Sequence, residues 1–330
     1  MKLGVSYFGN RIPRHVAADM KYLSDNHFTY VVHTFSENDY HFYHGTMKEI
    51  MAISRDNGLE TFIDPWGVGK IFGGEAFSEF ISSQPQVRQI LNDGQPAPIA
   101  CLNNPEFRSF LKKWIDAAAE TGADYVFWDE PHFYIAGWMG GRPGTWGCRC
   151  AFCRDKYQSR HGAPMPDVET ATVKDFKNDS IRDLLQEMIL YAHKLGLKNS
   201  LCVLPHSAED NRALQLLAGM EHLDNYGTDP YWYAFQKDAS EYVGTFAKKV
   251  VDVTAELGRE HHLWIQGFKV PAGREDEIGI AVRAAVDAGI RSLAVWGFDA
   301  CAHMSYIAPG NPARAWQAVL DAFRSVRDVV

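Results

Sequence analysis

One repeated unit runs through the 330-residue chain and limits its fold more than any other feature. In each copy a helical stretch ends at a Gly and a short, almost wholly apolar run follows, as after Gly122 (ADYVFWD) and Gly289 (IRSLAVW). Gly just past a helix commonly takes the left-handed conformation that ends the helix. An apolar run without polar alternation is typical of a parallel strand buried on both faces. The repeat therefore predicts alternating helices and parallel strands.

The number of units indicates how the strands are arranged. Five strands are expected directly after the glycines Gly58, Gly122, Gly196, Gly258 and Gly289. Three further strands are expected at residues 2–8, 28–35 and 223–229. Helices are expected near 13–25, 46–56, 105–121, 180–195, 208–219, 239–257, 275–288 and 312–328. The first strand is followed by no GxGxxG phosphate loop, which disfavours an open nucleotide-binding sheet. Eight strand–helix units predict an α/β fold, a (β/α)8 TIM barrel. We expect one domain over residues 1–330, with insertions at about 68–104 and 131–179 after the third and fourth strands.

Composition narrows the classes of partner. The chain has 41 Asp and Glu against 33 Lys and Arg, a formal net charge of −8, whereas a nucleic-acid footprint requires the opposite sign. No apolar run has the length of a membrane span, and the start MKLGVSYFG lacks the features of a signal peptide. We therefore expect no nucleic-acid partner, no membrane association and a cytoplasmic location. A homo-oligomer is compatible with the sequence.

Carboxylates and aromatic residues follow the predicted strands, at the end where the active sites of such barrels form. The candidates for substrate binding at these strand ends are Tyr7, His33, Glu37, Asp64, Trp66, His132, Trp232, Gln266, Phe268, Trp296 and Asp299. Aromatic rings can stack on the C–H faces of sugars, and carboxylates can bind hydroxyl groups. The nine Trp residues exceed what a globular core needs. This rim predicts a carbohydrate substrate.

Three acids are the candidate catalytic residues. Asp129 and Glu130 end the fourth strand, and Asp229 ends the sixth. Because side chains alternate along a strand, at least one of the adjacent acids should face the barrel mouth. Glycoside cleavage generally uses two carboxyl groups that flank one bond. We expect a glycoside hydrolase with Glu130 as acid/base, Asp229 as its partner and Asp129 orienting either of them. A reversal of these roles, and a substrate-assisted scheme in which Asp129 orients an N-acetyl group, both stay open.

Two other functions remain compatible with the residues. A metal-dependent barrel, such as a sugar isomerase or an amidohydrolase-like enzyme, could draw its ligands from His33, Asp64, Glu130, His206 and Asp229. The absence of an H-x-H motif after the first strand disfavours this class. A non-catalytic carbohydrate-binding barrel would keep the aromatic residues and would lose only affinity on replacement of Glu130.

Three cysteines crowd into one short segment, Cys148-Arg-Cys150-Ala-Phe-Cys153. Thiolates at this spacing suit a tetrahedral zinc ion. Cys101 is the first candidate for a fourth ligand and His161 the second. Four thiolates would leave no open coordination position, so the zinc would be structural. We expect this zinc ion as the metal cofactor and no organic cofactor.

The cysteine segment also carries a family resemblance. Cys101-Leu-Asn-Asn-Pro-Glu-Phe-Arg, a strand that ends in an acid, and then C-x-C-x-x-C-x-x-x-Tyr157 resemble the family 42 β-galactosidases over about residues 100–165. The resemblance implies a structural zinc site on the four cysteines and an acid/base role for Glu130. Asp129 stands where that family has Asn, and Gln266 ends the seventh strand, where the family carries its nucleophilic Glu. Neither a nucleophile nor galactose specificity therefore follows from the resemblance.

Overall fold

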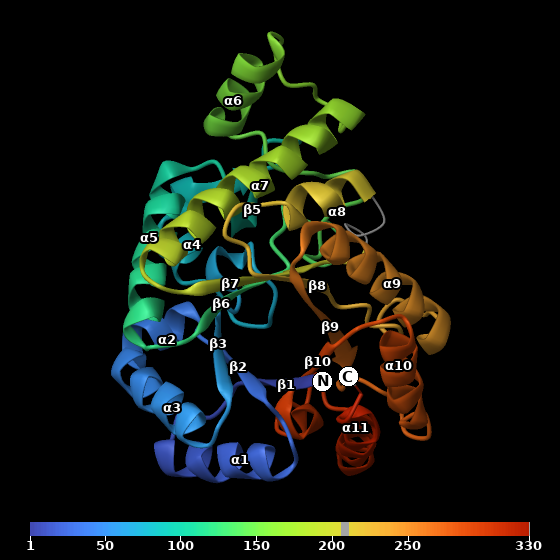
Figure 1. The fold of residues 1–330 in the computed structure, drawn as a ribbon. Coiled ribbons are helices and arrows are strands. Elements are labelled where there is room, and N and C mark those ends of the chain that lie inside the picture. Colours follow the sequence, from blue (N-terminus) through green and yellow to red (C-terminus); the bar gives the residue numbers. More distant parts are fainter. Residues whose placement is uncertain (206–210, 330) are drawn as a thin grey trace.

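The structure is a computed structural model that describes residues 1–205 and 211–329. Eight parallel strands close into a barrel in the order β1-β10-β9-β8-β7-β6-β3-β2 (Figure 1). Their bounds are Lys2–Tyr7 (β1), Tyr30–Thr34 (β2), Glu60–Asp64 (β3), Tyr125–Asp129 (β6), Lys198–Val203 (β7), Asn225–Thr228 (β8), Glu260–Gln266 (β9) and Ser292–Trp296 (β10). The first and last strands pair directly, with Lys2 opposite Ser292. The predicted (β/α)8 barrel is confirmed.

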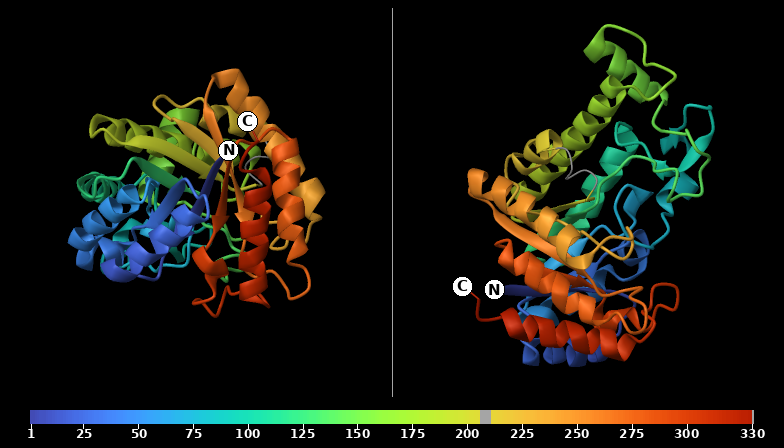
Figure 2. Two further views of the ribbon diagram at one scale, coloured as in Figure 1. Left: turned by 60° about the horizontal axis from the view of Figure 1, so that its bottom comes forward. Right: turned by 90° about the vertical axis from the view of Figure 1, so that its right-hand side faces the viewer.

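Helices surround the barrel strands (Figures 1 and 2). The principal ones are Pro13–Asp25 (α1), His44–Asp56 (α3), Pro105–Glu120 (α5), Ala171–Lys194 (α7), Asn211–Ala218 (α8), Ala239–Leu257 (α9), Asp276–Asp287 (α10) and Pro312–Val326 (α11). Asn104 and Asn311 cap α5 and α11, each just before a Pro at the first helical position. The glycines that precede five of the strands all have positive φ, from 63° at Gly258 to 106° at Gly289. The signal that predicted the strands is therefore a real helix end in each case.

The two insertions contain regular structure of their own. After β3 come the short helix Phe80–Ser83 (α4) and an antiparallel hairpin of Arg88–Ile90 (β4) and Pro96–Ala100 (β5). After β6 comes the helix Ala151–His161 (α6), which extends with the first turns of α7 beyond the rest of the barrel (Figures 1 and 2). Because Thr170 caps α7 by accepting a hydrogen bond from the Val173 backbone N–H, the helix begins at Ala171 rather than near residue 180.

Side chains inside the barrel form a cluster separate from the layer between strands and helices. Its strand residues alternate along the chain, with Tyr30 and Val32 on β2, Tyr125 and Phe127 on β6, and Trp264 and Trp296 on β9 and β10. The residues between them pack outward against the helices. This alternation decides which strand-end side chains point into the barrel mouth. None of the described helices combines the length and the apolarity that crossing a bilayer requires.

Candidate active site

Four carboxyl groups, here called the acid group, meet at the carboxyl ends of three strands. They are Asp64 of β3, Asp129 and Glu130 at the end of β6, and Asp229 just after β8. Asp64, Asp129 and Asp229 are buried, with exposures of 0%, 7% and 3%, and Glu130 is half-buried. The structure thus brings together all three candidate catalytic residues and one candidate for substrate binding.

Both adjacent acids of β6 belong to the group, although alternation guarantees only one. Asp129 lies two residues after the inward-facing Phe127 and continues its face. Glu130 has a left-handed backbone, with φ of 43°, and its N–H donates to the carbonyl oxygen of Cys202 at 3.0 Å. A Cβ added to Gly73 would lie 2.5 Å from Asp129 Oδ2 and 2.8 Å from Glu130 Oε2. Both carboxyl groups therefore approach the same point on the loop after β3.

Within the acid group, the surroundings of Glu130 and Asp229 affect their pKa values differently. Burial raises the pKa of Glu130 well above its usual range, and the charge of Asp229 and a hydrogen bond to its carboxyl group raise it further. Burial also raises the pKa of Asp229, to about 7, although the hydrogen bond with Glu130 acts in the opposite direction. The two carboxyl groups thus shift each other's pKa in opposite directions, which favours the proton on Glu130 and the negative charge on Asp229.

Asp64 is the least exposed residue of the group, at 0%. Burial raises its pKa well above the usual range, with further contributions from the charges of Asp129, Glu75 and Glu130. Neither of its carboxyl oxygens has a hydrogen-bond partner among the residues that the structure describes. A buried carboxyl group without partners is costly, so Asp64 is available to a group that enters from the mouth.

The segment 67–76 after β3 forms one wall of the site. The Gly73 N–H donates to the Asp129 carbonyl oxygen at 2.9 Å, and the His132 N–H donates to the Ile71 carbonyl oxygen at 2.9 Å. Ile71 and Phe72 are buried in the outer core. A side chain at Gly73 would collide with the carboxyl groups, so the close approach requires Gly at this position.

Glu37, a candidate for substrate binding, instead anchors this wall. It is 1% exposed in the short helix Glu37–Phe42 (α2). Its Oε1 accepts from the Gly69 N–H at 2.8 Å and the Ser78 hydroxyl at 2.6 Å, and its Oε2 accepts from the Phe80 N–H at 2.6 Å. These bonds occupy both oxygens and fix the loop next to the acid group.

Aromatic rings frame the opening above the acid group. Trp66 is half-buried and stacks on Phe8 at a centroid distance of 5.3 Å, and Phe8 contacts the predicted Trp296 at 5.6 Å. On the other side Tyr231 meets the predicted Phe268 edge-on at 5.0 Å. The predicted residues Trp66, Trp296 and Phe268 therefore do lie around the mouth.

Three other candidates point away from the mouth. The Tyr7 hydroxyl donates to Asp19 of α1 at 2.5 Å. His33 lies 2.8 Å from the Ser54 hydroxyl of α3, and burial lowers its pKa to about 3. Trp232 is 0% exposed, and its indole N–H donates to a Glu277 carboxylate oxygen at 2.8 Å. All three lie in the layer between the strands and the helices.

The remaining candidates support loops or lie on the surface. Gln266 accepts from the Tyr233 N–H at 3.1 Å and donates to the Phe268 carbonyl oxygen at 3.0 Å, which ties two mouth loops together. His132 Nδ1 lies 2.6 Å from the Glu130 carbonyl oxygen. Asp299 is exposed, in a left-handed turn with φ of 51°. His206, a candidate metal ligand, lies outside the described residues.

Sequence reasoning missed four residues of the site: Phe8, Gly73, Glu75 and Tyr231. Two of them carry a usable signal, because Tyr231 follows Asp229 by two positions and Phe8 ends the first strand on its inward face. Tyr231 lies close enough to Asp229 and Glu130 for their charges to raise its pKa, after burial as the main cause. Glu75 lies in an irregular loop, where no pattern indicates its direction.

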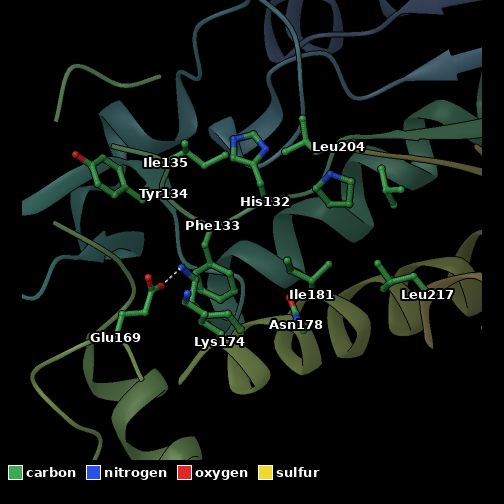
Figure 3. Close-up of a pocket in the computed structure, with 13 residues that line it drawn as sticks. His132, Phe133, Tyr134, Ile135, Glu169, Lys174, Asn178, Ile181, Leu204 and Leu217 are labelled. Carbon is green, nitrogen blue, oxygen red and sulfur yellow. Dashed lines mark hydrogen bonds and ion pairs between the residues drawn. The ribbon is translucent and has the colours of Figure 1, made fainter. Parts of the chain in front are cut away.

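A cavity of about 420 Å³ lies on the outer side of the loop after β6 (Figure 3). It is lined by this loop, by α7 and by Leu204 and Leu217, and His132, Phe133 and Ile181 project into it (Figure 3). Its lining includes His132, the neighbour of the acid group, but none of the four carboxyl groups.

Four cysteines, here called the cysteine group, meet between the two insertions. The sulfur atoms of Cys101, Cys148, Cys150 and Cys153 all lie within 4.8 Å of one another. Cys101 Sγ is 3.5 Å from the sulfurs of both Cys150 and Cys153. Tetrahedral zinc with bonds of about 2.3 Å spaces its sulfur ligands by about 3.8 Å, so the group is compatible with a metal ion. His161 instead packs against Tyr157.

Comparison with known proteins supports the fold. No known protein-family profile matches the chain, and no curated protein sequence matches it. Among solved structures, a β-galactosidase from Bacillus circulans sp. alkalophilus has a TM-score of 0.68 at 12% identity, covering 99% of this chain and 56% of that one. The β-amylase catalytic domain from Paenibacillus polymyxa has a TM-score of 0.64 at 12% identity, covering 98% and 97%. A D-psicose 3-epimerase has a TM-score of 0.52 at 12% identity, covering 100% and 99%. The chain shares the TIM-barrel fold with all three.

Proposed function

We propose that this protein hydrolyses a glycosidic bond, with Glu130 as the acid and Asp229 as its carboxylate partner. The observation that carries the proposal is the meeting of Glu130 and Asp229 at the carboxyl ends of β6 and β8, where Asp229 raises the pKa of Glu130 well above its usual range and Glu130 acts to lower the pKa of Asp229. A glycosidase needs one protonated and one ionised carboxyl group at neutral pH, and opposed environments supply that difference. The glycosidases among the structures of the same fold are consistent with this reading.

Each residue of the acid group has a distinct part in the proposed reaction. Glu130 protonates the oxygen of the departing sugar, and Asp229 either attacks the anomeric carbon or activates a water molecule. Asp129 is buried beside Glu130, and burial together with the charge of Glu130 raises the pKa of Asp129 well above its usual range, so its carboxyl group can orient either of the other two acids. Asp64 accepts hydrogen bonds from substrate hydroxyl groups, since its oxygens have no partner within residues 1–205 and 211–329. Trp66 and Phe268 supply ring faces for the saccharide.

The metal-dependent alternative has weaker geometric support. It requires several ligands to converge, but His33 faces α3 on the far side of β2. Among the described residues, only the cysteine group brings three or more possible ligand atoms within 4.8 Å of one another. The carboxyl groups of the mouth do not form such a set.

We further propose that the cysteine group holds a structural zinc ion. The four sulfurs fill a tetrahedral site and leave no position for substrate. Zinc there would link the hairpin after β3 to the start of α6. It would take no part in the chemistry at the acid group.

The proposed activity is tested by measuring sugar release from a panel of 4-nitrophenyl glycosides and neutral and acidic oligosaccharides. The matched control is the double variant Glu130→Gln/Asp229→Asn, purified identically, which reports any contaminating glycosidase. We expect the wild type to release product from at least one substrate and the control to release none. Equal release by both proteins on every substrate would refute the proposal.

A further inference from the structure

A second pocket opens beside the acid group, between the loops after β8 and β9. It has a volume of about 670 Å³ and is here called the basic pocket. Its lining residues are Tyr233, Ala234, Gln236, Lys237, Gln266, Phe268, Lys269 and Arg274. Three of the eight are cations and none is an acid. These cations gather in a chain whose formal net charge is −8.

The charges in the basic pocket are only partly neutralised. Arg274 pairs with Glu277 at 2.7 Å and lies over the Tyr233 ring. Lys237 and Lys269 form no ion pair with any carboxylate among the described residues. Lys269 Nζ lies 4.2 Å from the centroid of the Tyr306 ring, which directs the ammonium group without neutralising it. The charge of Lys269 also acts on the Glu75 carboxyl group, whose pKa it lowers, so the positive charge at this pocket is offset only in part.

The basic pocket connects with the proposed reaction site through aromatic side chains. Phe268 lines the pocket and meets Tyr231 edge-on at 5.0 Å, and Tyr231 follows Asp229 by two residues. Gln266 holds both walls of the pocket, because its side chain bonds to the backbone of Tyr233 and of Phe268. A saccharide with one ring at the acid group can therefore extend across Phe268 into the pocket.

We propose that the basic pocket binds an anionic substituent of the saccharide, a carboxylate or a sulfate ester, so that acidic glycans are the substrate class. This inference rests on the proposed function for its choice of a saccharide. The acid group itself would repel an anion, so the cations must act on a neighbouring sugar unit. Ammonium groups at a half-open site attract such a substituent through charge-assisted hydrogen bonds, and Tyr233 and Phe268 offer ring faces to the same unit.

The test is calorimetric titration of the Glu130→Gln variant, which binds without turnover, with two matched pairs of probes. One pair is trigalacturonic acid and its neutral methyl ester, and the other is a carrageenan tetrasaccharide and its desulfated form. We expect at least one anionic probe to bind about tenfold or more tightly than its neutral partner. Salt at about 0.5 M should abolish the difference, because it shortens the screening length to about 4 Å.

Two further variants assign the preference to the pocket. Adding Lys237→Ala/Lys269→Ala should remove most of the difference, whereas Lys48→Ala/Lys194→Ala, which removes two exposed lysines elsewhere, should preserve it. The inference is overturned if neither anionic probe is preferred, if the preference survives loss of the pocket lysines, or if the control pair abolishes it equally. Sugar release by the wild type is measured separately. Hydrolysis without anion preference refutes only this inference, and lysine-dependent binding without hydrolysis refutes only the proposed function.

Discussion

At the scale of single residues, the phase of each strand decides which polar side chains reach the barrel mouth. Asp64 and Asp129 each follow an inward-facing aromatic residue by two positions, whereas His33 and Tyr7 occupy the opposite phase. The sequence contained this information, because the alternation can be counted back from each strand end. It did not contain the direction of Glu130, which depends on a left-handed backbone that Glu rarely adopts.

The pKa of Asp229 predicts a cost in stability. The unfolded chain releases this proton near pH 3.8, but the folded protein keeps it up to about pH 7. The free energy of unfolding of the wild type therefore falls as the pH rises between these values, because the folded state binds more protons. We expect the free energy of unfolding of Asp229→Asn to match that of the wild type at about pH 4 and to exceed it by up to about 4 kcal/mol above pH 7. This figure comes from a pKa difference of about three units, at about 1.4 kcal/mol for each unit. Urea unfolding across this range measures the difference, and a variant no more stable than the wild type at about pH 8 would contradict the burial argument.

Two tryptophans that look alike in the sequence should behave differently. Trp66 is half-buried at the mouth, so Trp66→Ala should weaken saccharide binding by about 1–3 kcal/mol. Trp232 is fully buried and bonded to Glu277, so Trp232→Ala should leave a cavity and lower the free energy of unfolding by about 3–5 kcal/mol. Calorimetric titration and chemical denaturation of both variants check the contrast. A loss of affinity in a stably folded Trp232→Ala protein, with none in Trp66→Ala, would reverse these assignments.

At the scale of elements, the loop after β3 acts as a fixed wall for the acid group. Gly73→Ala would place a methyl group against Asp129 and Glu130. We expect this variant to lose most of its activity, by about 100-fold or more, because displacing catalytic groups by even about 1 Å is that costly. The matched control is Gly45→Ala in α3, where nothing lies within 4 Å of an added Cβ and Ala favours the helix by about 1 kcal/mol. Full activity in Gly73→Ala would show that the wall is not rigid.

The predicted elements and the missed ones differ in length and pattern. Five of the eight barrel strands follow helix-ending glycines, and α5 and α11 begin at Asn-Pro, so local chemistry marks these elements. The hairpin strands β4 and β5 have three and five residues and include Pro96, too short and too irregular for a periodic signal. Their position depends on contacts with distant segments, such as the backbone bond from Arg149 to Ile90. Local sequence could not predict such contacts.

At the scale of the whole molecule, the cysteine group connects two insertions that are separated along the chain. We expect one zinc ion per chain by elemental analysis. Cys148→Ser should lose the metal and lower the melting temperature by more than about 5 °C, because a metal that binds only the folded state stabilises it. The rate per folded molecule should stay close to that of the wild type, since zinc is proposed to be remote from the chemistry. Absence of stoichiometric metal, or a disulfide between any two of the four cysteines, would contradict the proposed site.

The central claim, that Glu130 supplies the proton to the leaving group, is tested most directly by the dependence of Glu130→Gln on the leaving group. The measurement is kcat/KM of the wild type and the variant on a series of aryl and alkyl glycosides of the sugar identified in the panel. For poor leaving groups we predict a loss of about 100- to 10,000-fold, the usual contribution of a general acid. The loss should shrink steadily towards activated leaving groups, whose departure needs little protonation. Asp229→Asn should instead lose activity on the whole series. A loss in Glu130→Gln that is independent of the leaving group would contradict the assignment of the acid to Glu130. A dependence on the leaving group that appears only in Asp229→Asn would contradict it too.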